Sequence, residues 1–278
     1  MEDLAARIPR PALMGIVNVT PDSFSDGGRY VEHDAAIAHA LRLVDEGAAI
    51  VDVGGESTRP GSEGVDEAEE LRRVVNVVAG IRAASDVAIS IDTTKSAVAE
   101  AAIAAGATLV NDVTAGTHDP RLLDVVRDAG VDVCLMHMQG TPRTMQDDPR
   151  YDDVVGEVGA YLRERVEACV ALGIDPGRIA VDPGIGFGKT VEHNLALLRH
   201  VRELGEATGC PVLIGASRKR FLGELLGDPD ADRVVASVVA GVAAVAHGAW
   251  VLRVHDVAAH RDALRVLLAI RDGRTVRP

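Results

Sequence analysis

The chain has 278 residues, of which 47% are hydrophobic and 26% charged, a composition ordinary for a globular protein. Its net charge of −13 repels nucleic acid and anionic membranes at long range. The longest apolar stretch, at 234–251, is interrupted by two glycines and two polar residues, so we expect neither a membrane nor a nucleic acid as partner.

Eight short apolar runs alternate with longer helical patterns along the chain. Each run is mainly apolar, as in strands buried on both faces of a parallel sheet. The strand-like runs are 13–19, 49–53, 87–91, 108–113, 131–137, 179–182, 211–216 and 250–254. Helical patterns lie near 34–46, 66–84, 96–105, 120–129, 153–172, 192–207, 231–247 and 257–270. Many end on a glycine suited to a helix C-cap, such as Gly106 and Gly130.

Eight β/α units over about 250 residues predict a single (β/α)₈ TIM barrel. We place this domain at 12–278, preceded by an N-terminal extension at 1–11. The alternative is an open, doubly wound parallel sheet. The barrel is favoured because no glycine-rich dinucleotide fingerprint follows the first strand.

The three cysteines, Cys134, Cys169 and Cys210, are far apart and odd in number. Their spacing fits neither a disulfide framework nor a metal cluster, so we expect reduced, buried thiols in a cytoplasmic protein. The N-terminus is not expected to be a signal peptide, because it carries two early acidic residues and no long apolar run.

Polar residues stand where strand after strand ends, and in a barrel these ends face one shared crevice. In chain order they are Asn18, the segment 54–59, Asp92, Asn111 with Asp112, His137, Asp182, the segment 217–219, and Arg253 with His255. A lone aspartate after a strand is more often a helix N-cap, and we favour a structural role for His137. Eight polar ends on one face nevertheless indicate an active site there.

The polar set divides into two chemical halves. Asp92, Asn111 and Asp182 offer acceptors and one amide, which suit the guanidine-like edge of a heterocycle such as a pterin. In the other half, Arg253 and His255 form an anion site, where the planar arginine fork suits phosphate oxygens. Asn18 could ligate a hard cation that bridges those oxygens, and strands 1 and 8 are neighbours in a closed barrel.

Three loops of unusual composition lie over the same face. The loop after the first strand runs from Thr20 to about His33, longer than a usual βα connection, and it contains Phe24. The loop at 54–61 is rich in glycine and proline, and both loops are candidate lids. The glycine-rich segment 182–189 is not a phosphate-binding Walker motif, because Asp182 and Pro183 occupy the strand end where a phosphate cradle would start.

Eight segments in order resemble those of the dihydropteroate synthase family. The first two are long and specific: NVTPDSFSDGG at 18–28 and GGESTRPG at 54–61. The others are SIDT at 90–93, VNDV at 110–113, MHMQG at 136–140, DPGIGFGK at 182–189, GASRK at 215–219 and RVHD at 253–256. The resemblance extends from about Leu13 to the last helix, with no departure at a motif position.

The resemblance implies a transferase that joins 6-hydroxymethyl-7,8-dihydropterin pyrophosphate to 4-aminobenzoate in folate biosynthesis. It implies a pterin site of Asp92, Asn111, Met136, Asp182 and Lys219. It implies a pyrophosphate site of Asn18, Arg253 and His255, with Mg²⁺ as cofactor on Asn18. It implies an aminobenzoate site of Phe24, Thr58, Arg59, Pro60, Phe187 and Ser217. The catalytic residues would be Lys219, Arg253, His255 and, in the closing loop, Asp26.

The implied mechanism is substitution at the pterin methylene carbon: pyrophosphate departs and the arylamine attacks. Two alternatives remain open, a catalytically silent paralogue that binds pterin and a pterin-dependent methyltransferase barrel. A homodimer is also expected. The Ala/Val-rich helices near 231–270 are consistent with a subunit interface or with tight packing on the barrel.

Overall fold

The computed structural model describes residues 4–20, 28–58, 61–62 and 64–273. Its eight strands are all parallel and pair in the order β6-β5-β4-β3-β2-β1-β8-β7. They are β1 (Ala12–Asn18), β2 (Ile50–Gly54), β3 (Ala88–Asp92), β4 (Leu109–Asp112), β5 (Asp132–Met136), β6 (Ile179–Asp182), β7 (Leu213–Ile214) and β8 (Val251–Val254). All eight predicted strands are therefore confirmed, seven of them with ends shifted by one to a few residues.

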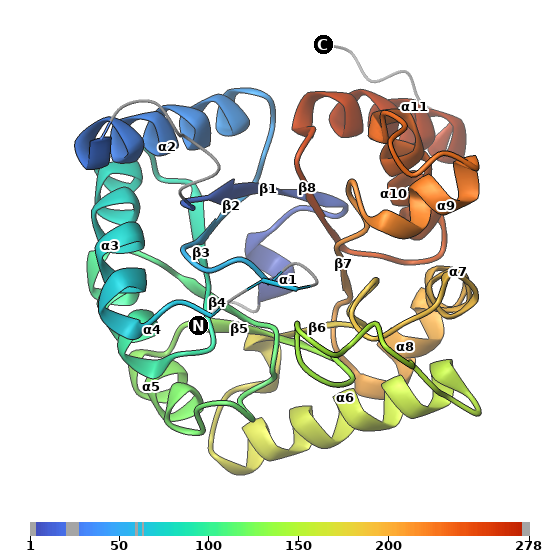
Figure 1. The fold of residues 1–278 in the computed structure, drawn as a ribbon, viewed down its shortest axis with the longest axis horizontal. Helices are drawn as coiled ribbons and strands as arrows, with labels where there is room; N and C mark the ends of the chain where they lie inside the picture. The colour runs from blue at the N-terminus through green and yellow to red at the C-terminus, as the bar shows by residue number, and fades with distance from the viewer. Residues whose placement is uncertain (1–3, 21–27, 59–60, 63, 274–278) are drawn as a thin grey trace.

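The two edge strands of this order, β6 and β7, meet and nearly close the sheet. Val181 and Val212 form an isolated parallel bridge, and the Val181 amide donates to the Pro211 carbonyl at 3.0 Å. A ring of helices surrounds the sheet, and the view down the barrel is nearly round (Figure 1). The predicted TIM barrel is confirmed, and the open doubly wound alternative is wrong.

Long helices follow most strands. They are α2 (Gly28–Asp45), α3 (Glu67–Ala84), α4 (Ser96–Ala105), α5 (Arg121–Ala129), α6 (Val154–Ala171), α7 (Val191–Arg199), α8 (Val201–Thr208), α9 (Arg220–Leu226), α10 (Val234–Ala246) and α11 (Val257–Asp272). The helix expected at 192–207 is divided at His200, α9 was not predicted, and α2 begins earlier than expected. Gly106 and Gly130 cap α4 and α5 in the left-handed conformation, as predicted.

Apolar side chains form two layers on either side of the strands. The larger layer lies between strands and helices, with fully buried residues such as Val53, Val78 and Ile91. The smaller layer fills the barrel interior with side chains that include Met14, Ile50 and Cys134. The barrel interior is thus a packed core.

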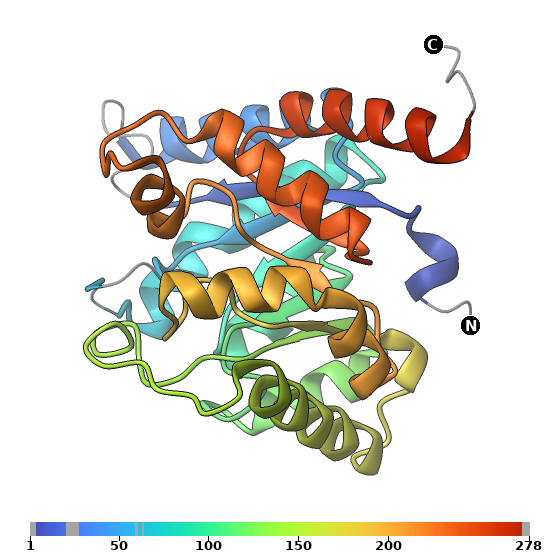
Figure 2. The same ribbon diagram turned by 90° about the vertical axis from the view of Figure 1, so that its right-hand side faces the viewer.

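The expected N-terminal extension packs under the barrel. Leu4 of helix α1 (Leu4–Arg7) and Ile8 bury their side chains in the interior layer. Arg7 donates to both carboxylate oxygens of the buried Asp132, at 2.6 and 2.7 Å. Helix α1 lies at the end of the barrel opposite the loop that follows β5 (Figure 2). Residues 4–8 therefore close the end of the barrel away from the polar strand ends.

Cys134, Cys169 and Cys210 are free and buried, as predicted. Within the residues that the structure describes, no helix is both long enough and apolar enough to cross a membrane.

Candidate active site

The carboxyl ends of the strands bring the predicted pterin-binding side chains to one end of the barrel. Asp92, Asn111, Met136 and Asp182 lie at or next to the ends of β3, β4, β5 and β6, and all four are buried. Asn18 ends β1 and is half-buried. These polar side chains therefore gather at one end of the barrel, because strand ends in a closed barrel converge.

Arg253 lies among carboxylates of this group. Its Nε donates to Asp52 Oδ2 at 2.6 Å, and its Nη2 donates to Asp92 Oδ2 at 2.7 Å. The Asn111 amide also donates to Asp52 Oδ2, at 3.3 Å. Arg253, which is expected to bind pyrophosphate, thus contacts Asp92, one of the side chains expected to bind the pterin.

Burial changes the proton affinity of this cluster. It raises the pKa of Asp92 to about 7, against the opposing charge of Arg253, and Asp52 adds a further raising effect. Burial alone would lower the pKa of Arg253, but the charges of Asp52 and Asp92 outweigh it and raise the value. The arginine therefore stays charged, while Asp92 changes its protonation near neutral pH.

Asp182 and Lys219 form a second charged group across the crevice. Asp182 Oδ1 accepts from the Gly184 amide at 2.7 Å, and burial raises the pKa of this carboxyl while Lys219 opposes the shift. Burial lowers the pKa of Lys219 to about 8, although Asp182 favours its charged form. Lys219 Nζ donates to the Ile185 carbonyl and lies 4.2 Å from the centre of the Phe187 ring. Lys219 therefore touches both the predicted pterin site and the predicted aminobenzoate site.

Ser217 and His255 meet beside this group. The Ser217 hydroxyl and His255 Nδ1 lie 3.1 Å apart, and the His255 amide donates to the same hydroxyl at 3.2 Å. Between Ser217 and Lys219, Arg218 adopts a left-handed backbone with φ of 57°, and its guanidinium pairs with Asp256. This strained residue lets its two neighbours face the crevice while Arg218 itself stays exposed.

A partly buried ion network holds the loop that follows β2. Lys95 Nζ donates to both Glu56 and Glu70, and Arg73 donates to the Gly55 carbonyl at 2.8 Å. The loop leads to Thr58, which is half-buried near the crevice end of the barrel. Phe24, Asp26, Arg59 and Pro60 lie outside the described residues.

Two features of the site were not assigned a role from the sequence. Asp52, the fully buried partner of Arg253, is a lone acid inside an apolar strand, and that interruption was the available signal. Lys189 was quoted only as part of a motif, yet its side chain is 3% exposed and its Nζ lies 3.0 Å from His137 Nδ1. Among the described residues, no group of three or more His, Cys, Asp or Glu side chains is placed to hold a metal ion.

A family model described as pterin binding enzyme matches residues 14–255. This match covers every strand end described above and most of the chain. The chain therefore belongs to the pterin-binding enzyme family.

Within that family the relatives define a narrower group. The dihydropteroate synthase of Neisseria meningitidis serogroup B is 50% identical over 268 residues, covering 95% of this chain and 94% of that protein. The Xanthomonas albilineans dihydropteroate synthase with 4-aminobenzoic acid has a TM-score of 0.88 at 52% identity, covering 94% of this chain and 93% of that one. The same enzyme in complex with 7,8-dihydropteroate has a TM-score of 0.84 at 49% identity, covering 94% of both chains. The chain belongs to the dihydropteroate synthases, which are transferases.

Proposed function

We propose that this chain condenses 6-hydroxymethyl-7,8-dihydropterin pyrophosphate with 4-aminobenzoate to give 7,8-dihydropteroate and pyrophosphate. The observation that carries the proposal is the convergence of Asp92, Asn111, Asp182 and Lys219 around Arg253 at the strand ends. Two carboxylates and one amide suit a ring edge rich in N–H donors, and the buried cations suit an anionic leaving group.

The pterin ring would lie between the ends of β3, β4 and β6. Asp92 and Asp182 would accept from its N–H and NH₂ groups, and the Asn111 amide can serve as donor and acceptor. Met136, buried at the end of β5, would supply an apolar contact. Such a ring replaces water over the carboxylates, which strengthens each hydrogen bond.

The pyrophosphate would lie over Arg253 and His255. Arg253 uses Nε and Nη2 on the two aspartates, and an arginine has five N–H donors, so further donors can face a phosphate. The half-buried Asn18 suits Mg²⁺, because one amide oxygen there leaves room for the phosphate oxygens and waters that this ion keeps. Mg²⁺ so held would neutralise charge on the leaving group.

In the reaction, the bond between the methylene carbon and the pyrophosphate oxygen breaks, and its electron pair leaves on pyrophosphate. The arylamine nitrogen then bonds to the methylene carbon and releases a proton. Arg253 and His255 would stabilise the departing anion, while Asp92 and Asp182 would face the developing positive charge on the pterin. Ser217, Phe187 and Thr58 would orient the aminobenzoate.

The test is pyrophosphate release with both substrates, with each substrate alone as control. We expect release and dihydropteroate formation only with both, and calorimetry should show weaker pyrophosphate binding without Mg²⁺. Pterin binding with no product would indicate the silent paralogue. Demethylation of methyltetrahydrofolate in place of pyrophosphate release would indicate the methyltransferase.

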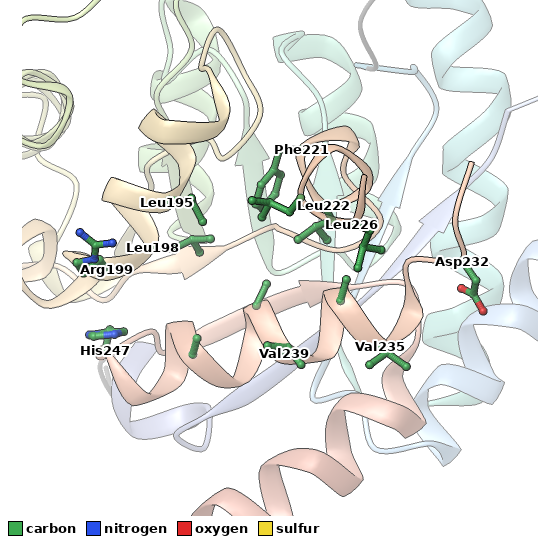
Figure 3. Close-up of a pocket in the computed structure, with 14 residues that line it drawn as sticks. Leu195, Leu198, Arg199, Phe221, Leu222, Leu226, Asp232, Val235, Val239 and His247 are labelled. Atoms are coloured by element: carbon green, nitrogen blue, oxygen red, sulfur yellow. The ribbon is translucent and has the colours of Figure 1, made fainter. Parts of the chain in front are cut away.

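A homodimer is the second part of the proposal. An apolar groove of about 530 Å³ lies between α7, α9 and α10, and side chains from all three helices point into it (Figure 3). Its large apolar residues are unusually exposed: Leu225 51%, Leu226 52%, Val235 75% and Val239 62%. An apolar surface of this kind favours a protein interface. Light scattering should give twice the chain mass, and Val239→Glu should give the monomer.

We also propose that the protein works in the cytoplasm. Its three cysteines are buried, unpaired thiols, a state that a reducing compartment preserves. Fractionation with an activity assay would test the location.

A further inference from the structure

The loop between β6 and α7, residues 183–190, is pressed against the end of β5. A Cβ on Gly184 would collide with the His137 carbonyl oxygen, and one on Gly188 would lie 2.5 Å from the Gln139 carbonyl oxygen. Both glycines have positive φ, 68° and 64°, which other residues rarely adopt. The backbone conformation of the loop is therefore restricted by the residues that follow β5.

Side chains from neighbouring segments hold the same loop by its backbone. The Tyr151 hydroxyl donates to the Gly188 carbonyl at 3.0 Å, and the Gln146 amide donates to the Gly186 carbonyl at 2.6 Å. The Gly186 amide in turn donates to Asn194 Oδ1 on α7 at 2.7 Å. So many bonds to one short loop indicate that its exact position matters.

Lys189 hydrogen-bonds to the backbone of Phe187 itself. Its Nζ turns back and donates to the Phe187 carbonyl at 2.9 Å, and it lies 3.0 Å from Nδ1 of the buried His137. From the other side, Lys219 lies over the Phe187 ring and donates to the Ile185 carbonyl. Phe187 is thus held at its backbone by one lysine and at its ring by another.

Burying a lysine amine is costly, and nothing in the proposed binding of pterin or pyrophosphate uses Lys189. Burial lowers its pKa to about 7, although Asp182 opposes the shift and Lys219 adds to it. Burial likewise lowers the pKa of His137 to about 3, and the charge of Lys189 adds to this effect. His137 is therefore neutral and can accept at Nδ1, and Lys189 keeps N–H donors for the Phe187 carbonyl in either protonation state.

We propose that Lys189, supported by His137, is a positioning residue for the aminobenzoate subsite. It fixes the Phe187 carbonyl, and with it the direction in which the Phe187 ring faces the incoming arylamine. This inference rests on the proposed function, because it assumes that Phe187 lines the aminobenzoate site. It assigns Lys189 no contact with either substrate.

The experiment compares steady-state kinetics of wild type, Lys189→Met and Lys189→Gln. The methionine variant keeps the length but removes the donors, whereas glutamine restores an N–H donor. Val166→Ala is the control for lost stability, because this buried residue lies in the second half of α6, away from the crevice. Each variant is assayed for the KM of both substrates, for kcat and for Tm.

We expect Lys189→Met to raise the KM for aminobenzoate about tenfold, the effect of one lost hydrogen bond of about 1.4 kcal/mol. The KM for the pterin substrate should change far less, and Lys189→Gln should recover part of the loss. Val166→Ala should lower Tm and leave both KM values as in wild type.

Equal changes in both KM values, or none, would overturn the inference while wild-type turnover still supported the proposed function. Inactive wild type would instead refute the proposed function. If Lys189→Met does not fold, Tyr151→Phe provides a second test, because it removes only the bond to the Gly188 carbonyl. It should raise the aminobenzoate KM selectively, and an unchanged ratio of the two KM values would count against the inference.

Discussion

Replacing Asp182 by asparagine separates two hydrogen-bonding roles of one carboxylate. Oδ1 accepts from the Gly184 amide at 2.7 Å, a local turn bond that an asparagine oxygen can also accept. Oδ2 lies on the side of Gly215, 3.9 Å from where a Cβ would stand on that residue. We assign this second oxygen to the pterin, where an amide NH₂ would place a donor against a donor.

The expected magnitudes differ for folding and binding. The turn bond survives and a buried charge is removed, so Tm should shift by no more than about 3 °C, equivalent to about 1 kcal/mol. The facing donors leave buried groups unpaired at about 1–3 kcal/mol each, so pterin affinity should fall about tenfold or more. Asp182→Ala should lose the turn bond as well, and therefore should lower both Tm and affinity.

The assay is a melting curve together with pterin calorimetry on each variant. Asp132→Asn is the matched control, because Asp132 is equally buried but pairs with Arg7 at the other end of the barrel. It should lower Tm and leave pterin affinity unchanged. If Asp182→Asn melted much earlier and bound pterin normally, Asp182 would be structural, and the pterin site would lose its centre.

Three further outcomes follow from the charged groups. Arg253→Lys keeps the charge but loses the planar fork, so kcat/KM should fall about tenfold or more, and wild-type rates would refute the phosphate role. Aminobenzoate should bind poorly to the empty protein and well once pyrophosphate and a pterin are present; calorimetry that gives equal affinities would contradict this coupling. Lys189 has a folded pKa of about 7, below the unfolded value of 10.5, so the unfolded chain holds more protons between these values and stability rises with pH there. The wild-type advantage over Lys189→Met in unfolding free energy should therefore grow by about 2 kcal/mol from pH 7 to 9, as measured by urea unfolding, and a constant difference would refute the burial argument.

The barrel and the strand-end residues could be predicted because both depend on local patterns. Alternating apolar runs and helical periods define β/α units, and a closed barrel then places every strand end on one face. The predicted strand at 179–182 and helix at 96–105 agree with the structure residue for residue. Strand β7 is much shorter than predicted, because its pairing with β6 is limited to one isolated bridge. The hydrophobicity pattern of a segment does not determine how many of its residues pair with a neighbouring strand.

Features that leave no hydrophobic period in the sequence were not predicted. Helix α1 has four residues, too few for a helical pattern, and it is stabilised by burial under the barrel. The break at His200 comes from backbone angles of −110° and 28° within an apolar pattern that continues on both sides. Helix α1 depends on tertiary contacts, which override local propensity.

Asp52 and Lys189 could not be assigned a role from the sequence, because their environment depends on segments distant in the chain. Asp52 and Arg253 are 201 residues apart in the chain, and only the closure between β1 and β8 brings them together. Lys189 looks like an ordinary charged residue after a glycine-rich turn, and its burial depends on the end of β5. The position of a polar residue at a strand end can be predicted from the sequence. The neighbouring groups that determine its charge state are brought together only by the fold.

The contact between Arg253 and Asp92 joins two halves of the site that sequence reasoning treated separately. A pterin that hydrogen-bonds to Asp92 competes for the carboxylate that holds Arg253, and a phosphate on Arg253 competes for the same guanidinium. Each ligand therefore changes the partner available to the other, which is the physical requirement for coupled binding. Since burial raises the pKa of Asp92 to about 7, protonation below that pH weakens the ion pair and the link it provides. The coupling between the pterin and pyrophosphate subsites should consequently be stronger above pH 7 than below it.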